Sequence, residues 1–118
     1  MNNVNLLGTL VDDPTLSVDR SGKHVCVMHL AVPRRQTNGQ LQPGVVYVDV
    51  AIFGGQARVF ANHLTAGDRV GVSGSLERED ALEVGPRRSR WEVHAHQVDI
   101  VDAVTPAVSD YSRLPTGT

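Results

Sequence analysis

The stretch from Tyr47 to Leu76 is predicted to form a strand, a short helix and a second strand, and this order limits the folds open to the chain. Its central part has apolar residues at the spacing i, i+3, i+4 and i+7, which is typical of a helix with one buried side. These residues are Ala57, Phe60, Ala61 and Leu64. The flanking stretches, Val45 to Phe53 and Arg69 to Leu76, are β-rich and predict strands. This unit, in an otherwise all-β chain, indicates a small barrel that binds through its surface.

Glycines mark both ends of the predicted helix. Gly54-Gly55 interrupts the strand before it. Gly67 follows the last periodic residue, and we expect it to supply the left-handed conformation that ends a helix. The helix is therefore expected to have roughly three turns.

Further strands are predicted on both sides of this unit. They cover about Asn3 to Val11, His24 to Pro33 and Arg90 to Val101, and the strand from Arg69 continues to about Glu79. Pro14 ends the first strand because it cannot donate a ladder hydrogen bond. Gly8 marks a bulge or bend, which a strand needs to curl between two parts of a sheet.

The strand order β-β-β-α-β-β predicts an all-β fold, the five-stranded OB-fold barrel, with one short helix between the third and fourth strands. Barrels of this kind bind oligonucleotides or oligosaccharides through a sheet face and its loops. We expect the barrel in residues 1–103. Residues 104–118 contain Pro, Ser and Thr with little periodicity, and are predicted to form a flexible tail.

The charge of the chain gives no overall sign of a polyanion-binding protein. The formal net charge is -2 and the pI is near 6.2, so nucleic acid would have to be held by a local patch. Lys23 is the one lysine among 11 basic residues. Arginine suits bidentate recognition of phosphate, although a GC-rich genome would give the same bias.

The single cysteine, Cys26, excludes an intrachain disulfide and a thiolate zinc cluster. Its alternation with Met28 and Leu30 predicts an inert, buried thiol. The residues after Met1 lack the pattern of a signal peptide, and no stretch approaches the ~18 apolar residues of a membrane span. We therefore expect a cytoplasmic protein without membrane contact.

Three stretches carry a family resemblance. They are Val4 to Pro14, then Val50 to Leu76 with its strand, helix and strand, and finally Glu92-Val93 in the last strand. With these, residues 3 to 101 resemble the bacterial single-stranded DNA-binding protein family, SSB. The resemblance implies a nucleoid-associated homo-oligomer, a tetramer or a dimer, that wraps single-stranded DNA. It implies no catalysis, metal or cofactor.

By position, Tyr47 and Phe53 fall on stacking aromatics of the family. They are six residues apart in one strand, so both face the same side at a separation of about 20 Å, although either could instead be a core or subunit-interface aromatic. Trp91 is predicted to stack on a base or to pack at the barrel core or edge. Two other family aromatics are missing here, at about Gln36 and Ala81, and Asp49 stands where the family favours a basic residue.

The predicted phosphate contacts are arginines in two clusters, one after the second strand and one at the last hairpin. They are Arg34, Arg35, Arg87, Arg88 and Arg90, and the alternative for both clusters is solvated loop charge. His94 and His96 alternate onto one strand face, but two imidazoles do not make a metal site. No catalytic arrangement of residues is visible, so the sequence predicts no enzyme.

The sequence thus predicts a sequence-tolerant protein that coats and protects single-stranded DNA in replication, recombination or repair. The alternative is an OB-fold interaction module similar to primosomal replication protein B, with weak affinity for single-stranded DNA. The missing aromatics and Asp49 favour that alternative. The acidic tip that recruits replication and repair proteins in the family is absent from the sequence, which suggests a paralogue or a removed tail.

Overall fold

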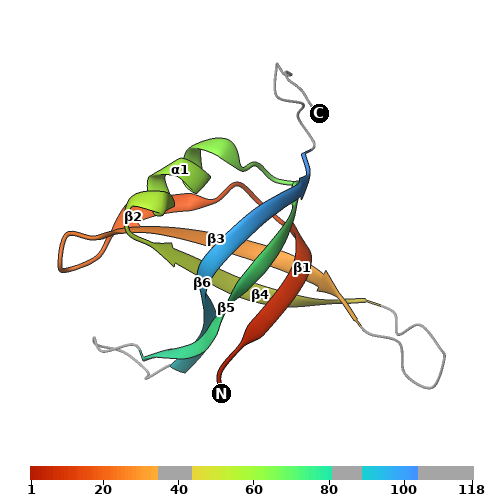
Figure 1. Cartoon of the computed structure of the whole chain (residues 1–118), viewed down its shortest axis with the longest axis horizontal. Helices are drawn as coiled ribbons and strands as arrows, with labels where there is room; N and C mark the ends of the chain where they lie inside the picture. The colour runs from red at the N-terminus through yellow and green to blue at the C-terminus, as the bar shows by residue number, and fades with distance from the viewer. Residues whose placement is uncertain (35–43, 81–88, 104–118) are drawn as a thin grey trace.

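A computed structural model of the chain describes residues 1–34, 44–80 and 89–103 (Figure 1). The strands are β1 (Val4–Leu10), β2 (Thr15–Val18), β3 (His24–Pro33), β4 (Val45–Phe53), β5 (Arg69–Asp80) and β6 (Ser89–Asp102), and the helix α1 (Gly55–His63) lies between β4 and β5. The predicted strands agree with these bounds to within one residue. The predicted tail, residues 104–118, lies outside the described residues.

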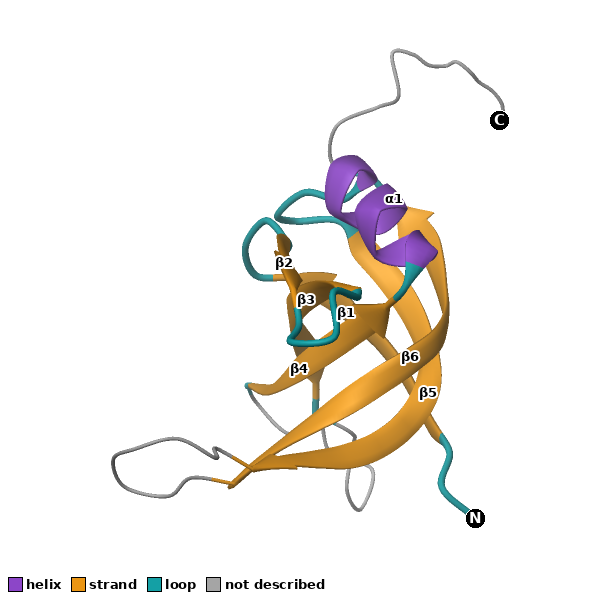
Figure 2. Cartoon of the chain, turned by 90° about the vertical axis from the view of Figure 1, so that its left-hand side faces the viewer, coloured by secondary structure: helices purple, strands orange, loops and turns teal. Residues whose placement is uncertain are grey.

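Five of the strands close into a barrel. The ladder runs β1-β5-β6-β4-β3, and a pairing of β1 with β3 joins its two ends. Neighbours are antiparallel except β4 and β6, which run parallel at Val50↔Val93 and Ala51↔His94. α1 lies across one end of the barrel (Figure 2). The predicted five-stranded barrel with one helix is confirmed.

β1 closes the barrel because it pairs with two strands. It pairs with β5 from Val4 to Thr9, and Thr9 and Leu10 also pair with Ala31 and Leu30 of β3. At the crossing, a Cβ on Gly8 would lie 3.0 Å from the backbone oxygen of Ala31. The absence of a side chain there lets β1 pass close to β3, as the sequence predicted for a strand shared between two parts of the sheet.

β2 is a strand that the sequence analysis did not predict. Its four residues are exposed, and they pair only with His24 to Val27 of β3. The β2–β3 turn is held by the carboxylate of Asp19, which accepts hydrogen bonds from the backbone N–H groups of Ser21 and Lys23, both at 2.9 Å. Because β2 has no buried side, its sequence lacks the alternating pattern that predicts a strand. Only its pairing with β3 defines it.

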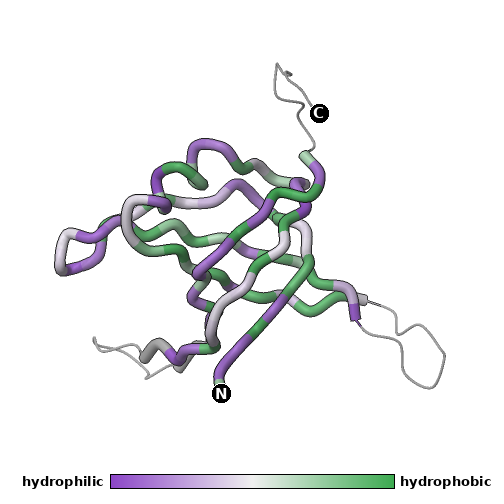
Figure 3. Tube along the Cα trace, in the orientation of Figure 1, coloured by the Kyte–Doolittle hydropathy of each residue, from purple (hydrophilic) through white to green (hydrophobic). Residues whose placement is uncertain are grey.

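Alternate residues of the strands fill the barrel with one apolar core. Figure 3 shows that β3 and β4 are mainly apolar along their length. The inward residues include Cys26, Met28, Leu30, Val50, Ile52, Val70, Val72 and Val93, and α1 adds Ala57 and Leu64. Phe60 and Ala61 pack against this cluster, so the predicted buried stripe of the helix is confirmed.

Cys26 lies within this core with none of its surface exposed. Burial raises the pKa of its thiol, because a thiolate would be poorly solvated there. The predicted buried thiol is therefore confirmed.

The end of α1 differs from the prediction. The helix ends at His63, and Leu64 is already extended, with φ of -100° and ψ of 149°. Gly67 has the expected positive φ of 95°, but it belongs to the next turn, from Thr65 to Asp68. The N–H of Gly67 donates to the carbonyl of Leu10 at 2.8 Å. The left-handed glycine therefore joins the helix–strand turn to β1 and does not end the helix.

β6 carries an extra residue opposite Gly74. Ser73 pairs with Gln97 and Gly74 pairs with Ala95, which leaves His96 between them. A Cβ at position 74 would overlap the backbone oxygen of His94 and lie 2.9 Å from the Cα of Ala95. Glycine is needed where two backbones approach this closely, and the bulge breaks the alternation of β6. The expectation that His94 and His96 share one face assumed unbroken alternation, and it stays a prediction.

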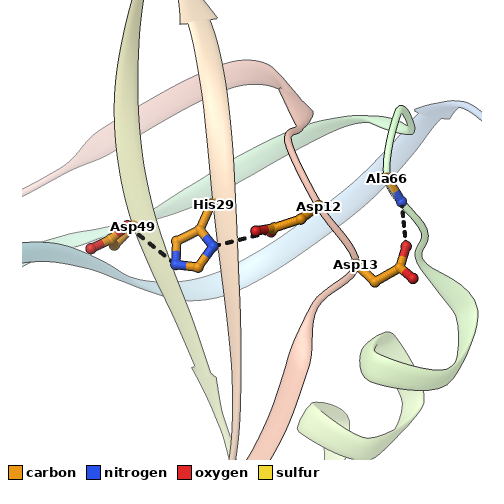
Figure 4. Close-up of polar contacts among 5 residues, drawn as sticks. All are labelled: Asp12, Asp13, His29, Asp49 and Ala66. Carbon is orange, nitrogen blue, oxygen red and sulfur yellow. Dashed lines mark hydrogen bonds and ion pairs between the residues drawn. The ribbon is translucent and has the colours of Figure 1, made fainter.

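Asp13 ties the end of β1 to the turn after α1 (Figure 4). Its carboxylate accepts hydrogen bonds from the N–H of Ala66 at 2.8 Å and the hydroxyl of Thr65 at 2.9 Å. Both bonds favour the charged form, and they lower the pKa of Asp13, the Ala66 bond most.

Replacing Asp13 with alanine is expected to lower the Tm at pH 7, because both bonds are lost. The folded-state pKa is below the ordinary 3.8, so this stabilisation is present above about pH 4 and disappears as the pH falls through the lowered pKa. The Tm difference from the unaltered protein should therefore narrow in acid. Thermal unfolding by circular dichroism at pH 7 and pH 3 measures it. Asp99→Ala is the control, since Asp99 lies on β6, where it accepts a hydrogen bond from Gln97 and does not contact this turn. A Tm difference that widens in acid would contradict the assignment.

Candidate nucleic-acid interface

The side of the β3–β4 ladder that faces away from the barrel core carries a row of residues that we call the outer wall, in which Val25 and Ala51 are themselves buried. It consists of Val25, Val27, His29 and Ala31 of β3, opposite Phe53, Ala51, Asp49 and Tyr47 of β4. The alternate residues of both strands point into the core, so strand alternation fixes this face outward. The predicted aromatics Tyr47 and Phe53 are thus on one side of one strand.

Tyr47 is the more accessible of the two rings. It is 72% exposed, and its cross-strand neighbour is the small Ala31, so the ring stands clear of the sheet. Phe53 is 37% exposed, and its ring centroid lies 4.9 Å from that of His94, with the planes tilted by 59°. Neither ring belongs to the barrel core, so within this chain the core alternative does not hold for either residue.

Between the two rings, His29 lies in a row with two carboxylates (Figure 4). Its Nδ1 is 3.1 Å from Oδ1 of Asp12, and its Nε2 is 3.7 Å from Oδ1 of Asp49. Asp49 pairs directly with His29 across the ladder, and its side chain is 28% exposed. The wall therefore presents a partly exposed carboxylate two residues along β4 from Tyr47.

A second histidine and carboxylate border the wall on β6. Glu92 is only 4% exposed, and its Oε1 lies 2.8 Å from Nε2 of His94. A buried carboxylate needs such a partner, because an unpaired charge away from water is costly. This contact holds the imidazole that supports Phe53.

The structure describes only part of the predicted arginine clusters. Arg34 follows β3 and is exposed, with its N–H 3.4 Å from the carbonyl of Gly44, so it lies at the Tyr47 end of the wall. Arg90 pairs with Glu79 in the β5–β6 ladder, and its side chain is not described. Arg35, Arg87 and Arg88 lie outside the described residues.

Trp91 lies on a different face from Tyr47 and Phe53. It has the same alternation as Val93, which is buried in the core, and it lies where the β5–β6 pair extends past the barrel. Trp91 is 58% exposed, and the guanidinium carbon of Arg78 is 5.6 Å from its ring centroid. The predicted stacking residues are thus divided between two surfaces.

Sequence reasoning missed the contributions of His29 and Arg78. Both depend on register, since His29 is opposite Asp49 and Arg78 is opposite Trp91. Within residues 1–34, 44–80 and 89–103, no three His, Cys, Asp or Glu side chains come close enough to share a metal ion. The same part of the chain has no helix of the length and apolarity that a membrane span requires.

Comparison with known proteins identifies the family. The profile described as the single-strand binding protein family matches residues 1–101. The chain belongs to the single-strand binding protein family. The SSB resemblance that we found in the sequence is therefore confirmed.

Individual SSB proteins resemble the chain over most of its length. The single-stranded DNA-binding protein of Treponema pallidum (strain Nichols) is 30% identical over 105 residues, which are 88% of this chain and 60% of that protein. Single-stranded DNA-binding protein 2 of Staphylococcus aureus (strain Mu50 / ATCC 700699) is 35% identical over 103 residues, 86% of this chain and 73% of that protein. The chain thus spans less than two thirds of the Treponema relative.

A solved SSB structure has the same fold. The crystal structure of the wild-type single-stranded DNA binding protein from Thermus aquaticus matches with a TM-score of 0.73 at 27% identity, over 88% of this chain and 52% of that one. Together with the strand order, this confirms the predicted OB-fold barrel.

Proposed function

We propose that this protein binds single-stranded DNA without strict sequence preference and coats it in replication, recombination or repair. The observation that carries the proposal is the 72% exposed ring of Tyr47, on the same side of β4 as Phe53, in a member of the SSB family. Exposed aromatics on an OB-fold sheet offer stacking surfaces that accept any base. The role is binding without catalysis.

The path of the phosphates follows from the same arrangement. Arg34 lies at the Tyr47 end of the wall, and we propose Arg35, Arg87, Arg88 and Arg90 as further contacts. Trp91, with Arg78 over its ring, offers a second stacking position on the extended β5–β6 hairpin. A single DNA strand that reached both the outer wall and Trp91 would pass around one end of the barrel.

We also propose that the protein acts as a homo-oligomer. Members of the SSB family typically oligomerise, and we propose a homotetramer or homodimer in which residues 1–103 are the binding domain, with a location on the nucleoid. We propose replication or repair proteins as its protein partners, because they act on the single-stranded DNA that it would coat. Size-exclusion chromatography with light scattering would give the number of subunits.

Binding is expected to weaken steeply with salt, since each neutralised phosphate releases counterions. For about five phosphates, one for each proposed arginine, the slope of log K against log salt should be about -3.5 on a single strand. Fluorescence anisotropy of a labelled, unstructured oligonucleotide of mixed sequence, measured at several salt concentrations, gives the slope. The matched duplex is the control and should bind more weakly, because its bases are not free to stack. Absence of binding at low salt would refute the proposed function.

A second candidate is an interaction module similar to primosomal replication protein B, with weak affinity for single-stranded DNA. It is favoured by the carboxylates of Asp12, Asp49 and Glu92 on or beside the outer wall, which repel phosphate. This candidate requires a complex with a replication protein that survives nuclease treatment. Co-elution with the resident SSB or a helicase, before and after nuclease, separates the two functions.

A further inference from the structure

Asp49 is a residue of the outer wall that phosphate contacts do not explain. It is the next outward residue after Tyr47 on β4, about 7 Å along the strand, so it lies within reach of the edge of a base that is stacked on the tyrosine ring. Its negative charge would repel a phosphate at the same place. A DNA strand with a base stacked on Tyr47 must therefore turn its bases, and not its phosphate backbone, toward this carboxylate.

His29 lies beside Asp49 on the outer wall. Its Nε2 lies 3.7 Å from Oδ1 of Asp49, which is longer than a hydrogen bond, and its Nδ1 lies 3.1 Å from Oδ1 of Asp12. An ionised carboxylate has about four acceptor sites and no donor. With 28% of its side chain exposed, Asp49 can accept a hydrogen bond from a ligand in addition to its contacts within the protein.

The Asp49 carboxylate, as a hydrogen-bond acceptor, can distinguish cytosine from thymine. Cytosine carries an amino donor at N4, whereas thymine carries a carbonyl acceptor at O4, and the two pyrimidines are otherwise similar in size. A carboxylate attracts the first group and repels the second. Adenine and guanine also carry exocyclic amino groups.

Resting on the proposed function, we propose that Asp49 biases the site toward bases with an exocyclic amino group and against thymine. The bias modulates a site whose main affinity comes from stacking, so it is a preference and not a strict sequence code. Asp49 is the specificity-determining residue of this proposal.

The test measures the ratio of the Kd for oligo-dT to the Kd for oligo-dC, in the unaltered protein and in Asp49→Asn. Oligo-dC stacks on itself more than oligo-dT, so the change in the ratio is informative, and its absolute value is not. At pH 8 oligo-dC stays single-stranded. We expect the ratio to fall at least about threefold in Asp49→Asn, because the amide offers a donor as well as an acceptor.

Asp99→Asn is the matched control. Asp99 is an exposed carboxylate on β6, bonded to Gln97, and it pairs with Gly71, away from the outer wall. The change in net charge is the same, so both oligonucleotides should bind slightly more tightly while their ratio stays within about twofold. Asp49→Ser repeats the test if the asparagine variant does not fold.

The possible results separate the two proposals. An unchanged ratio in the Asp49 variants, or an equal change in Asp99→Asn, overturns the base preference while leaving the binding of single-stranded DNA intact. Absence of binding to the mixed-sequence oligonucleotide as well overturns the proposed function, and the base preference with it. A fall in the ratio that is confined to the Asp49 variants supports the proposal.

Discussion

Replacing Tyr47 with alanine is expected to weaken the binding of single-stranded DNA about 5- to 150-fold, since one stacked base contributes ~1–3 kcal/mol. The ring is 72% exposed and outside the barrel core, so its removal should leave folding almost unchanged. Anisotropy titration with the mixed-sequence oligonucleotide measures the loss, and the Tm checks the fold.

Tyr47→Phe is the matched variant, because it keeps the ring and removes only the hydroxyl. It should bind within about threefold of the unaltered protein if stacking is the source of affinity. Equal losses in the alanine and phenylalanine variants would assign the role to the hydroxyl, and no loss in either would remove Tyr47 from the interface. Phe53 is less suitable for this test because its ring also packs against His94, 4.9 Å away.

Gly74→Ala is expected to destabilise the fold strongly for the addition of a single methyl group. The new Cβ would overlap the backbone oxygen of His94, and backbone cannot move aside as a side chain can. We expect a loss of about 2–3 kcal/mol in the free energy of unfolding, or on the order of 10 °C in Tm.

Gly71→Ala provides the control on the same strand. A Cβ at position 71 has the backbone oxygen of Leu6 as its nearest neighbour, at 4.0 Å, so the change should stay within about 0.5 kcal/mol. Urea unfolding of both variants gives the comparison. If Gly74→Ala were as stable as Gly71→Ala, the close approach at the β6 bulge would not be a requirement of the fold.

The elements that the sequence predicted well are those with local patterns. The spacing of Ala57, Phe60, Ala61 and Leu64 predicted the buried side of α1, and the bounds of β3 and β4 were predicted without error. β2 was missed because all its residues are exposed and only its pairing with β3 defines it. The bulge at His96 was missed for a related reason, since its cause, Gly74, lies on another strand.

The candidate site was predictable for single residues but not for their arrangement. Tyr47 and Phe53 share a face because both lie on one strand, and alternation is a local property. The contact of His29 with Asp49 depends on the register of β3 against β4, and the long connection between these strands gives no turn geometry from which to derive it. Trp91 was grouped with the other aromatics because residue type says nothing about which face of a sheet a residue occupies.

The buried position of Cys26 has a practical consequence for studying the proposed binding. It is the only cysteine of the chain, none of its surface is exposed, and burial raises the pKa of its thiol. Maleimide reagents need an accessible thiolate, so the folded protein should remain unlabelled. One cysteine introduced at an exposed position, such as Val59 on α1, would then carry a fluorophore at a single known location, without first removing a native thiol.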